Sequence, residues 1–273
     1  MSTLVCFHAH PDDECITTAG IMAQARELGH RVVLVLATRG ELGEVPEGFL
    51  DDGEQLSDRR TTETLAAAEV IGADRVEFLG YRDSGMAGEP TNDHPGSFWT
   101  ADVGEAAERL AVILAEEQPE VFVIYDDHGV YFHPDHIQVH RVGSRASQLV
   151  TIPTVLEATL NRDLFRRGQE AMEAADGDSS DVDTPDVDVD TWGTLEVDIT
   201  HSIDVTDYLG LKRSALRAHA SQIAEESFWL SMDDDAFATA FGHEWFVDHR
   251  TARVDGEPFR TNIWSDVNSG ADN

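Results

Sequence analysis

The sequence predicts an α/β protein with a Rossmann-like, doubly wound and mostly parallel sheet, helices on both faces of that sheet, and a smaller C-terminal part. Short apolar, β-prone runs alternate with segments of helical periodicity, which indicates βαβ units with right-handed crossovers. The hydrophobic content of 41% over 273 residues suffices for a core. Histidines and carboxylates directly follow two of the apolar runs, at the sheet edge where such folds bind ligands.

Each element follows from a local pattern, taken in chain order. Apolar and β-branched runs predict buried strands, and apolar residues that recur every three to four positions predict helices. Gly29 and Gly72 close the first two helices. The predicted strands are residues 4–7, 31–36, 75–79, 121–125, 155–159 and 241–247, and the predicted helices are 16–28, 57–71, 103–117, a segment beginning at Pro134, and 205–223.

A single domain with an insertion is expected. Residues 1–165 form the Rossmann-like catalytic core, and residues 196–265 complete the same domain with a helix and a strand. Residues 166–195 are acidic and poor in apolar side chains, which is typical of a solvated insertion. Residues 266–273 are a polar tail that we expect to fray. The sequence has no GxGxxG motif, so we expect no dinucleotide-binding phosphate loop.

The charge is strongly negative, with 53 Asp and Glu residues against 19 Lys and Arg residues. Such a surface repels nucleic acid and anionic lipid, so we expect neither as a partner. Residues 172–190 hold only eight of the carboxylates, so the acidity is spread along the chain rather than confined to one tail. Lys212 is the only lysine. These features predict a protein from a high-salt proteome; an ordinary protein with an acidic tail is the alternative.

The compartment is predicted to be the cytoplasm. No run of about 18 apolar residues is present, and the N-terminus lacks a basic region followed by an apolar one. We therefore expect neither a transmembrane helix nor a signal peptide. The two cysteines, Cys6 and Cys15, are too few for a disulfide framework.

Two polar clusters indicate a metal site. The first has the sequence AHPDDE (residues 9–14) and lies where the first strand passes to a helix, so that His10 and Asp13 can reach one ion. The second, HPDH (residues 133–136), follows the strand 121–125, and its proline suits the first turn of a helix. If both loops open at the same sheet edge, His10, Asp13 and one histidine of the second cluster form a three-ligand site. Three protein ligands with an open position are typical of catalytic zinc.

The remaining residues of the clusters supply the groups that hydrolysis needs. Asp12 is adjacent to Asp13 but points elsewhere, so it can take a proton from a water molecule whose pKa the metal lowers to about 7. Asp135 can hold the ring of His133 and favour its imidazolium form. That cation would stabilise an oxyanion or a leaving amine. The set fits hydrolysis of an amide or an ester.

Neighbouring residues have simpler interpretations. His8 is expected to be structural, and His140 to be an exposed or hydrogen-bonded helix residue. Cys15 is interpreted as a small buried thiol at a helix start. Glu14 is either a carboxylate behind the metal ligands or a helix cap. His219, in the middle of the predicted helix 205–223, is interpreted as a packed side chain.

In order and separation, the two clusters resemble the LmbE-like (PIG-L) family of zinc-dependent N-deacetylases. The resemblance implies that His10, Asp13 and His136 bind Zn²⁺, with Fe²⁺ as a possible substitute. It also implies that Asp12 is the general base and His133 the charged electrostatic catalyst. Both roles agree with the chemistry inferred from the residues.

Further motifs resemble the branch of this family that contains the mycothiol deacetylases and mycothiol S-conjugate amidases. By that similarity, Arg60 and Asp83 hold sugar hydroxyls and Tyr131 is a mobile active-site tyrosine. Without the family resemblance, Arg60 would be interpreted as a helix-surface arginine and Asp83 as a turn residue. The resemblance covers residues 3–165 well and residues 205–247 weakly. The motifs are GELGE (40–44), RTTE (60–63), RDSGM (82–86), YDDHGVY (125–131) and AHASQ (218–222).

The sequence therefore predicts a metal-dependent hydrolase that removes an acyl group, in the first place acetyl, from the nitrogen of a small glucosamine-type substrate. An amidase that cleaves thiol-conjugate amides is the alternative among enzymes, and a carbohydrate- or metal-binding relic is the alternative outside them. Asp12 argues against the relic, because metal binding alone has no use for a free carboxylate beside the ligands. A homo-oligomer is compatible with all of these features.

The dispersed negative charge predicts that salt stabilises the fold. At molar salt the Debye length falls to about 3 Å, so repulsion between surface carboxylates is screened. We expect the melting temperature to rise between low salt and molar KCl. A thermal unfolding series over that range measures it, and a flat or falling melting temperature would contradict the high-salt interpretation.

Overall fold

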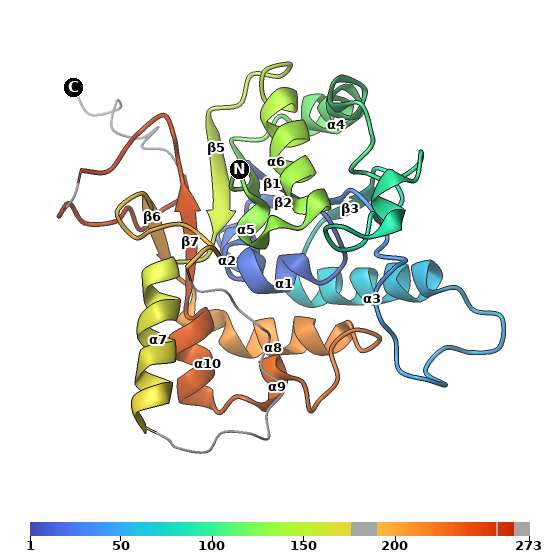
Figure 1. The fold of residues 1–273 in the computed structure, drawn as a ribbon. Coiled ribbons are helices and arrows are strands. Elements are labelled where there is room, and N and C mark those ends of the chain that lie inside the picture. Colours follow the sequence, from blue (N-terminus) through green and yellow to red (C-terminus); the bar gives the residue numbers. More distant parts are fainter. Residues whose placement is uncertain (176–189, 255, 265–273) are drawn as a thin grey trace.

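Seven strands form one sheet in the computed structural model, which describes residues 1–175, 190–254 and 256–264 (Figure 1). The strand order is β3-β2-β1-β4-β5-β7-β6; neighbours among the first five are parallel, whereas β7 is antiparallel to both β5 and β6. This confirms the predicted α/β class. The bounds are β1 Thr3–His8, β2 Arg31–Leu36, β3 Arg75–Phe78, β4 Val121–Tyr125, β5 Thr154–Thr159, β6 His201–Asp204 and β7 His243–Val247.

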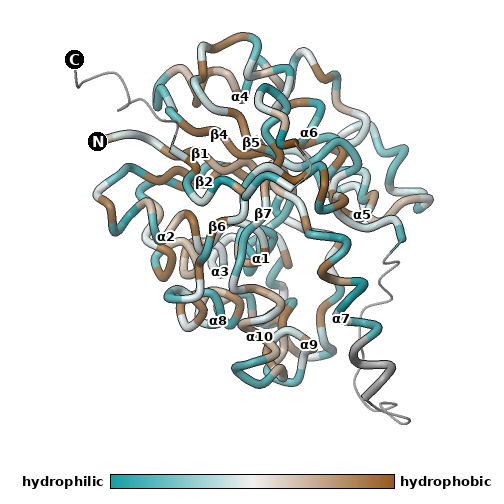
Figure 2. The backbone as a smooth tube through the Cα atoms, turned by 90° about the vertical axis from the view of Figure 1, so that its left-hand side faces the viewer, coloured by the Kyte–Doolittle hydropathy of each residue, from teal (hydrophilic) through white to brown (hydrophobic). Residues whose placement is uncertain are grey.

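The central strands are buried on both faces and form the core. Residues 4–7 of β1 and 32–36 of β2 are completely inaccessible to solvent. Their near-continuous apolar sequences are typical of parallel strands that helices cover on both sides. The register pairs every residue of β1 with one of β2, so the two apolar runs lie side by side. Figure 2 shows these hydrophobic strands enclosed between layers of helices.

Helices cover the sheet in separate layers (Figures 1 and 2). Helices α4 and α6 pack against each other on one face, and α2 and α3 lie on the other. Helix α8 packs on α3 and α2 as a further layer, and α9 and α10 lie against α8. The bounds are α1 Asp13–Thr17, α2 Ala19–Glu27, α3 Leu56–Ile71, α4 Val103–Glu117, α5 Gly129–Phe132, α6 Pro134–Ala146, α7 Arg162–Ala175, α8 Leu209–Ala218, α9 Phe228–Ser231 and α10 Asp234–Phe241, with short 3₁₀ helices η1 at Pro90–Asp93 and η2 at Thr206–Tyr208.

Two predicted helices differ from the observed ones. The predicted helix 16–28 begins earlier and is divided into α1 and α2 at Thr18, where φ is −141°. The Thr18 hydroxyl lies 2.8 Å from the buried Nε2 of His8, and this contact accompanies the break. The predicted helix 205–223 ends at Ala218, because His219 leaves the helical conformation with a ψ of 46°.

The C-terminal half contains elements that the sequence patterns did not reveal. Helix α7 extends into the expected acidic insertion, whereas residues 176–189 and the expected tail lie outside the described residues. The strand β6 and the helices α9 and α10 were not predicted, because each has at most eight residues and too few periods for a clear pattern. Over the ranges that the structure describes, no helix combines the length and apolar character needed to span a membrane.

The only lysine of the sequence joins the C-terminal part to the core. The Lys212 ammonium on α8 donates to Glu244 of β7 at 2.7 Å and to the Ile16 carbonyl at 3.1 Å. The side chains of this ion pair are each only 1% exposed. The Glu244 carboxylate also accepts the backbone N–H groups of Gly20 and Ile21, each at 2.8 Å, at the N-terminal end of α2. The pair therefore connects α8, β7 and α2.

Removal of the lysine should destabilise the fold. Lys212→Met leaves a buried carboxylate without its cation, and breaking such a pair costs about 3–5 kcal/mol. Arg217→Met is the matched control, because the Arg217–Glu225 pair is half-exposed and its loss costs less than about 1 kcal/mol. Urea unfolding followed by circular dichroism measures both changes. Equal urea midpoints for the two variants would show that the buried pair stabilises the fold no more than the half-exposed pair does.

Candidate active site

The two polar clusters meet where the strand order of the sheet reverses. From β1 the chain continues through β2 to β3 on one side, whereas β4 lies on the other side of β1. Loops that leave the carboxyl ends of two such strands diverge, and ligands bind between them. His10 follows β1 and His133 follows β4, and their ring centroids are 4.7 Å apart. The expectation that both loops open at one sheet edge is confirmed.

Asp13 lies between two histidines at the centre of the cluster. Its Oδ2 atom is 3.4 Å from His10 Nδ1 and 3.3 Å from His136 Nε2, and it also accepts the backbone N–H of His10 at 2.8 Å. His133 is close enough that one nitrogen from each of the three histidines lies within 4.8 Å of the others. All four side chains are buried or nearly so. The chain thus forms a buried His/Asp cluster that is a candidate metal site.

Two of the separations in this cluster are compatible with a tetrahedral metal ion. Ligand atoms at about 2.0–2.1 Å from such an ion lie about 3.3–3.4 Å from one another. The distances from the Asp13 carboxylate to His10 and to His136 match that separation. Two imidazoles and one carboxylate are also the donors that divalent transition metals accept. His133 also belongs to a group of three histidine nitrogens within 4.8 Å of one another, so Asp13 and His133 are both candidates for the third donor.

Asp12 and Asp13 have different electrostatic environments although they are neighbours in the chain. Burial opposes ionisation of Asp13, but His136 and His10 outweigh it and hold the pKa of Asp13 well below its usual range. Burial raises the pKa of Asp12 to about 6, although the Arg60 guanidinium acts in the opposite direction. Asp12 is therefore the carboxylate whose proton affinity suits proton transfer near neutral pH.

Asp12 occupies a strained corner that other side chains support. Its φ of 92° is unusual for a residue with a side chain. Its backbone N–H donates to Glu14 Oε2 at 3.0 Å, and its Oδ2 accepts from Arg60 Nη2 at 3.0 Å. Glu14 is completely buried and Arg60 is only 4% exposed. The interpretation of Arg60 as a helix-surface arginine is thus wrong, and Glu14 accepts the backbone N–H of Asp12, the residue that precedes α1.

The Asp135 carboxylate does not hold the ring of His133, which corrects the prediction. It accepts from the backbone N–H of Ser84 at 2.9 Å and from the Ser84 hydroxyl, and it lies 3.2 Å from His10 Nε2. His133 instead accepts the backbone N–H of Asp135 at Nδ1, at 3.1 Å, as the N-cap of α6. Burial, with His10 and His136 nearby, lowers the pKa of His133 to about 2, which disfavours the imidazolium form.

Asp83 connects the loops around this cluster. Its Oδ1 atom lies 3.6 Å from His10 Nε2 and accepts the backbone N–H of Gly85 at 2.9 Å, and its Oδ2 accepts that of Leu42 at 3.2 Å. Burial opposes ionisation, yet His10 keeps the pKa of Asp83 below its usual range. Asp83 is therefore more than a turn residue. Ser84, which its residue type alone does not mark as a site residue, lies in the same RDSGM motif.

Tyr131 lies in a strained loop beside the His/Asp cluster. Its hydroxyl is 3.4 Å from His136 Nε2. The flanking Val130 and Phe132 have φ values of 67° and 68°, and a β-branched residue rarely adopts such a conformation. The Val130 carbonyl accepts the backbone N–H of Gly193, and the Trp192 ring lies 5.2 Å from that of Tyr131. Residues near the end of the expected insertion 166–195 thus contact the site, which the sequence did not indicate.

The residues with simpler interpretations behave largely as expected. His8 is buried with ring nitrogens 2.7 Å from the Tyr125 hydroxyl and 2.8 Å from that of Thr18. His140 Nδ1 lies 3.1 Å from the Tyr125 carbonyl. Cys15 is completely buried, and burial raises the pKa of its thiol. His219 is completely buried too, but it lies beyond the end of α8 rather than in mid-helix.

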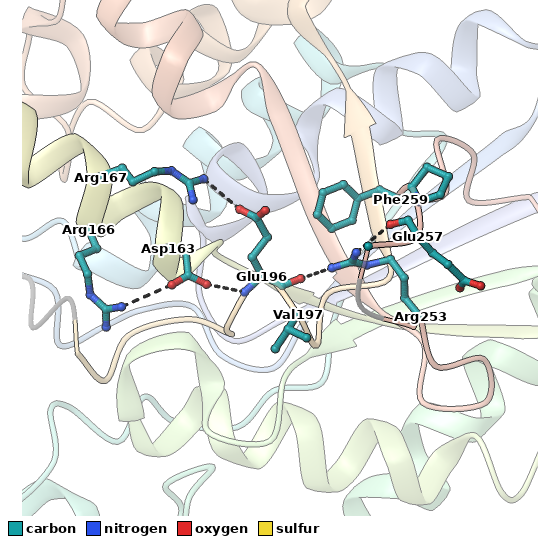
Figure 3. Close-up of a pocket in the computed structure, with 10 residues that line it drawn as sticks. Asp163, Arg166, Arg167, Glu196, Val197, Arg253, Glu257 and Phe259 are labelled. Carbon is teal, nitrogen blue, oxygen red and sulfur yellow. Dashed lines mark hydrogen bonds and ion pairs between the residues drawn. The ribbon is translucent and has the colours of Figure 1, made fainter.

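An open pocket of about 550 Å³ lies elsewhere, between α7 and the segments on either side of residue 255 (Figure 3). Its arginines already have partners: Arg167 contacts Glu196 at 2.9 Å, and Arg253 donates to the Ile199 carbonyl at 2.7 Å. Arg166 lies 3.4 Å from Asp163. Each of these guanidinium groups therefore already has an acceptor within the protein. None of the predicted site residues lines this pocket.

Fold and site together define an α/β protein with a candidate metal site at the topological switch point, and comparison with known proteins gives the family. The profile of PIG-L, described as GlcNAc-PI de-N-acetylase, matches residues 5–147. The chain belongs to the PIG-L (LmbE-like) family of N-deacetylases, which confirms the predicted family and enzyme class.

Relatives of similar length support this assignment. A protein of Acidothermus cellulolyticus named 1D-myo-inositol 2-acetamido-2-deoxy-alpha-D-glucopyranoside deacetylase is 41% identical over 90% of this chain and 88% of its own. A protein of Thermobifida fusca with the same name is 42% identical over 81% of this chain and 83% of its own.

Solved structures show the same fold at low sequence identity. The N,N'-diacetylchitobiose deacetylase of Pyrococcus horikoshii matches with a TM-score of 0.60 and 21% identity, over 90% of this chain and 82% of its own. GalB of Pseudomonas putida, a 4-carboxy-2-hydroxymuconate hydratase, matches with a TM-score of 0.57 and 18% identity, over 94% of this chain and 100% of its own. Because a hydratase shares the fold, the fold alone does not establish the reaction.

The support that Arg60 gives to Asp12 can be tested through a glycine. A Cβ atom at Gly40 would overlap the Arg60 guanidinium, so Gly40→Ala should displace that side chain. Hydrogen bonds to charged groups contribute about 1.5–3 kcal/mol, so we expect kcat/KM for deacetylation to fall about ten- to a hundredfold. Gly48→Ala is the matched control, since Gly48 also has a positive φ but no atom within 4 Å of an added Cβ. Acetate release measures both, and equal losses would contradict the role of Arg60.

Proposed function

We propose that this chain hydrolyses the acetamide of a 2-acetamido-2-deoxyglucopyranoside linked to inositol, releasing acetate and a free amine. The observation that carries the proposal is the relative at 41% identity over 90% of the chain, whose name states that substrate. The buried cluster of His10, Asp13 and His136 supports it, because amide hydrolysis by this family depends on a metal site. We expect the reaction to take place in the cytoplasm of a cell with high internal salt.

His10, Asp13 and His136 would hold the metal, with Zn²⁺ or Fe²⁺ as candidates. When bound, such an ion lowers the pKa of water and polarises the amide carbonyl. The residues fit this task because the carboxylate of Asp13 lies 3.4 Å and 3.3 Å from the two imidazoles. Asp135, whose carboxylate lies 3.2 Å from His10 Nε2, would fix the orientation of that ring.

Asp12 would act as the general base and then as the general acid. It takes a proton from the attacking water while the oxygen–carbon bond forms, and it passes that proton to the nitrogen as the carbon–nitrogen bond breaks. His133 accepts a backbone N–H at Nδ1, so its other nitrogen can carry the proton and donate to the developing oxyanion. Tyr131, whose hydroxyl is 3.4 Å from His136 Nε2, would approach the same oxygen after its loop moves.

Asp83 and Arg60 would contact the sugar. Asp83 lies 3.6 Å from His10 Nε2, so a hydroxyl next to the acetamide can reach its carboxylate. The guanidinium of Arg60 already donates to the Gly40 carbonyl at 2.8 Å and to Asp12 at 3.0 Å. If Arg60 contacts the substrate, the same side chain therefore both binds the sugar and holds Asp12, the proposed base, in place.

A substrate panel tests the proposed reaction. Acetate release is measured with Zn²⁺ or Fe²⁺ added, on the inositol glycoside of N-acetylglucosamine, on free N-acetylglucosamine and on N,N'-diacetylchitobiose, and amine release is measured on an amide of a thiol conjugate. We expect the inositol glycoside to give the highest kcat/KM. A higher value for the thiol-conjugate amide would make the chain an amidase, and no turnover of any compound would refute hydrolysis.

Variants of the neighbouring residues Asp12 and Asp13 test their different proposed roles, general base and metal ligand, in the same assay. Asp12→Asn should retain the metal and lose general-base catalysis, typically about 10²- to 10⁴-fold in kcat. Asp13→Ala should lose metal and activity together, because a charged ligand is removed. Metal content by mass spectrometry is read against rate. Loss of metal in Asp12→Asn, or near-normal turnover, would remove Asp12 from the role of base.

A further inference from the structure

The turn after α8 reaches the corner that holds Asp12. His219 in this turn is completely buried, and its Nε2 lies 2.8 Å from Glu14 Oε1. The other oxygen of Glu14 accepts the backbone N–H of Asp12 at 3.0 Å. A side chain from the C-terminal part of the chain is thus connected to the proposed base through one carboxylate.

The same turn also contacts helix α3, which carries Arg60, the residue that donates to the Asp12 carboxylate. The backbone N–H and the hydroxyl of Ser221 donate to the two oxygens of Glu63 on α3, at 2.8 Å and 2.6 Å. One turn earlier on that helix, Arg60 donates to the Asp12 carboxylate at 3.0 Å. The residues that support the backbone of Asp12 and those that support its side chain are therefore linked through residues 219–221.

A buried carboxylate such as Glu14 needs hydrogen-bond donors in place of water. Its contacts are the Asp12 N–H at 3.0 Å, His219 at 2.8 Å and the Cys15 thiol at 3.6 Å, and the shortest of them is the one to the His219 ring. Without a donor at this position, the Glu14 carboxylate would turn away toward another donor. That change weakens its hold on Asp12, whose left-handed conformation is costly without support.

We propose that His219 is a positioning residue that acts through Glu14 to hold the backbone of Asp12 in its left-handed conformation. The proposal rests on the proposed function of Asp12 as the general base. His219 touches no reacting atom; it sets the direction from which the Asp12 carboxylate meets the water. Its effect should therefore fall on kcat rather than on substrate binding.

A second metal site is the alternative use of this cluster, since ligand atoms of Glu14, Cys15 and His219 lie within 4.8 Å of one another. The separation of 2.8 Å between His219 Nε2 and Glu14 Oε1 favours a hydrogen bond, because two ligands of a tetrahedral ion lie about 3.3 Å apart. The burial that raises the pKa of the Cys15 thiol also disfavours the thiolate that a metal would need.

Variants of His219 test the proposal in the full-length protein. His219→Ala should lower kcat about 10- to 100-fold, as expected for a misplaced catalytic group, with KM and metal content within about twofold of the original. His219→Gln places an amide N–H₂ near the position of Nε2 and should restore most of the rate. His219→Asn, whose amide is one carbon short of Glu14, should not. His201→Ala removes another buried histidine, on β6, and is the control for loss of packing alone.

Several results would overturn the proposal. They are an unchanged kcat in His219→Ala, no difference between the Gln and Asn variants, and the loss of one metal ion per chain, which would indicate the second metal site. Crystal structures of metal-free His219→Ala and His219→Gln give a readout that does not depend on turnover. We expect the Asp12–Glu14 hydrogen bond to be lost in the first and kept in the second. If the Asp12–Glu14 hydrogen bond is unchanged in both variants, His219 does not position Asp12. This result would refute the proposal even if the chain has no deacetylase activity.

Discussion

The geometry of the site depends on one backbone constraint, the left-handed turn at Asp12 between β1 and α1. Because φ is 92° there, the chain changes direction within a single residue, and His10 and Asp13 on either side converge on one point. A residue with a side chain adopts this conformation only where its surroundings compensate the cost. Here Glu14 accepts the backbone N–H of Asp12, and Arg60 donates to its carboxylate. The geometry of the His/Asp cluster therefore depends on two buried polar side chains.

The C-terminal part of the chain consequently belongs to the site although it contributes no proposed metal ligand. Its turn after α8 contacts Glu14 and Glu63, and its β7 carries Glu244, which caps α2. The family profile matches residues 5–147 alone, yet relatives align over most of the chain, which is consistent with a structural requirement for this part. The strands β6 and β7 of this part belong to the same sheet as the core, and its helix α8 packs against α1, α2 and α3.

Local sequence patterns predicted the parts of the structure that local interactions determine. Strands 31–36 and 121–125 and helix 103–117 have the predicted bounds, because each has an unbroken pattern between clear signals. The polar clusters were also recognisable, since they follow strands whose edge could be predicted. What could not be predicted depends on partners far away in the chain. Neither the pairing of Asp135 with Ser84 nor the burial of Arg60 has a local signal.

The single lysine gives the protein an unusual chemical property. Lys212 is completely buried, so the folded chain presents no ε-amine to solvent, and all its other basic side chains apart from histidine are arginines. Reagents that acylate amines would reach this side chain only when α8 separates from β7. The rate of its labelling would then report how often the C-terminal layer opens at this one position, without an introduced probe. The single ε-amine of the sequence is thus a natural sensor of the contact between α8 and β7.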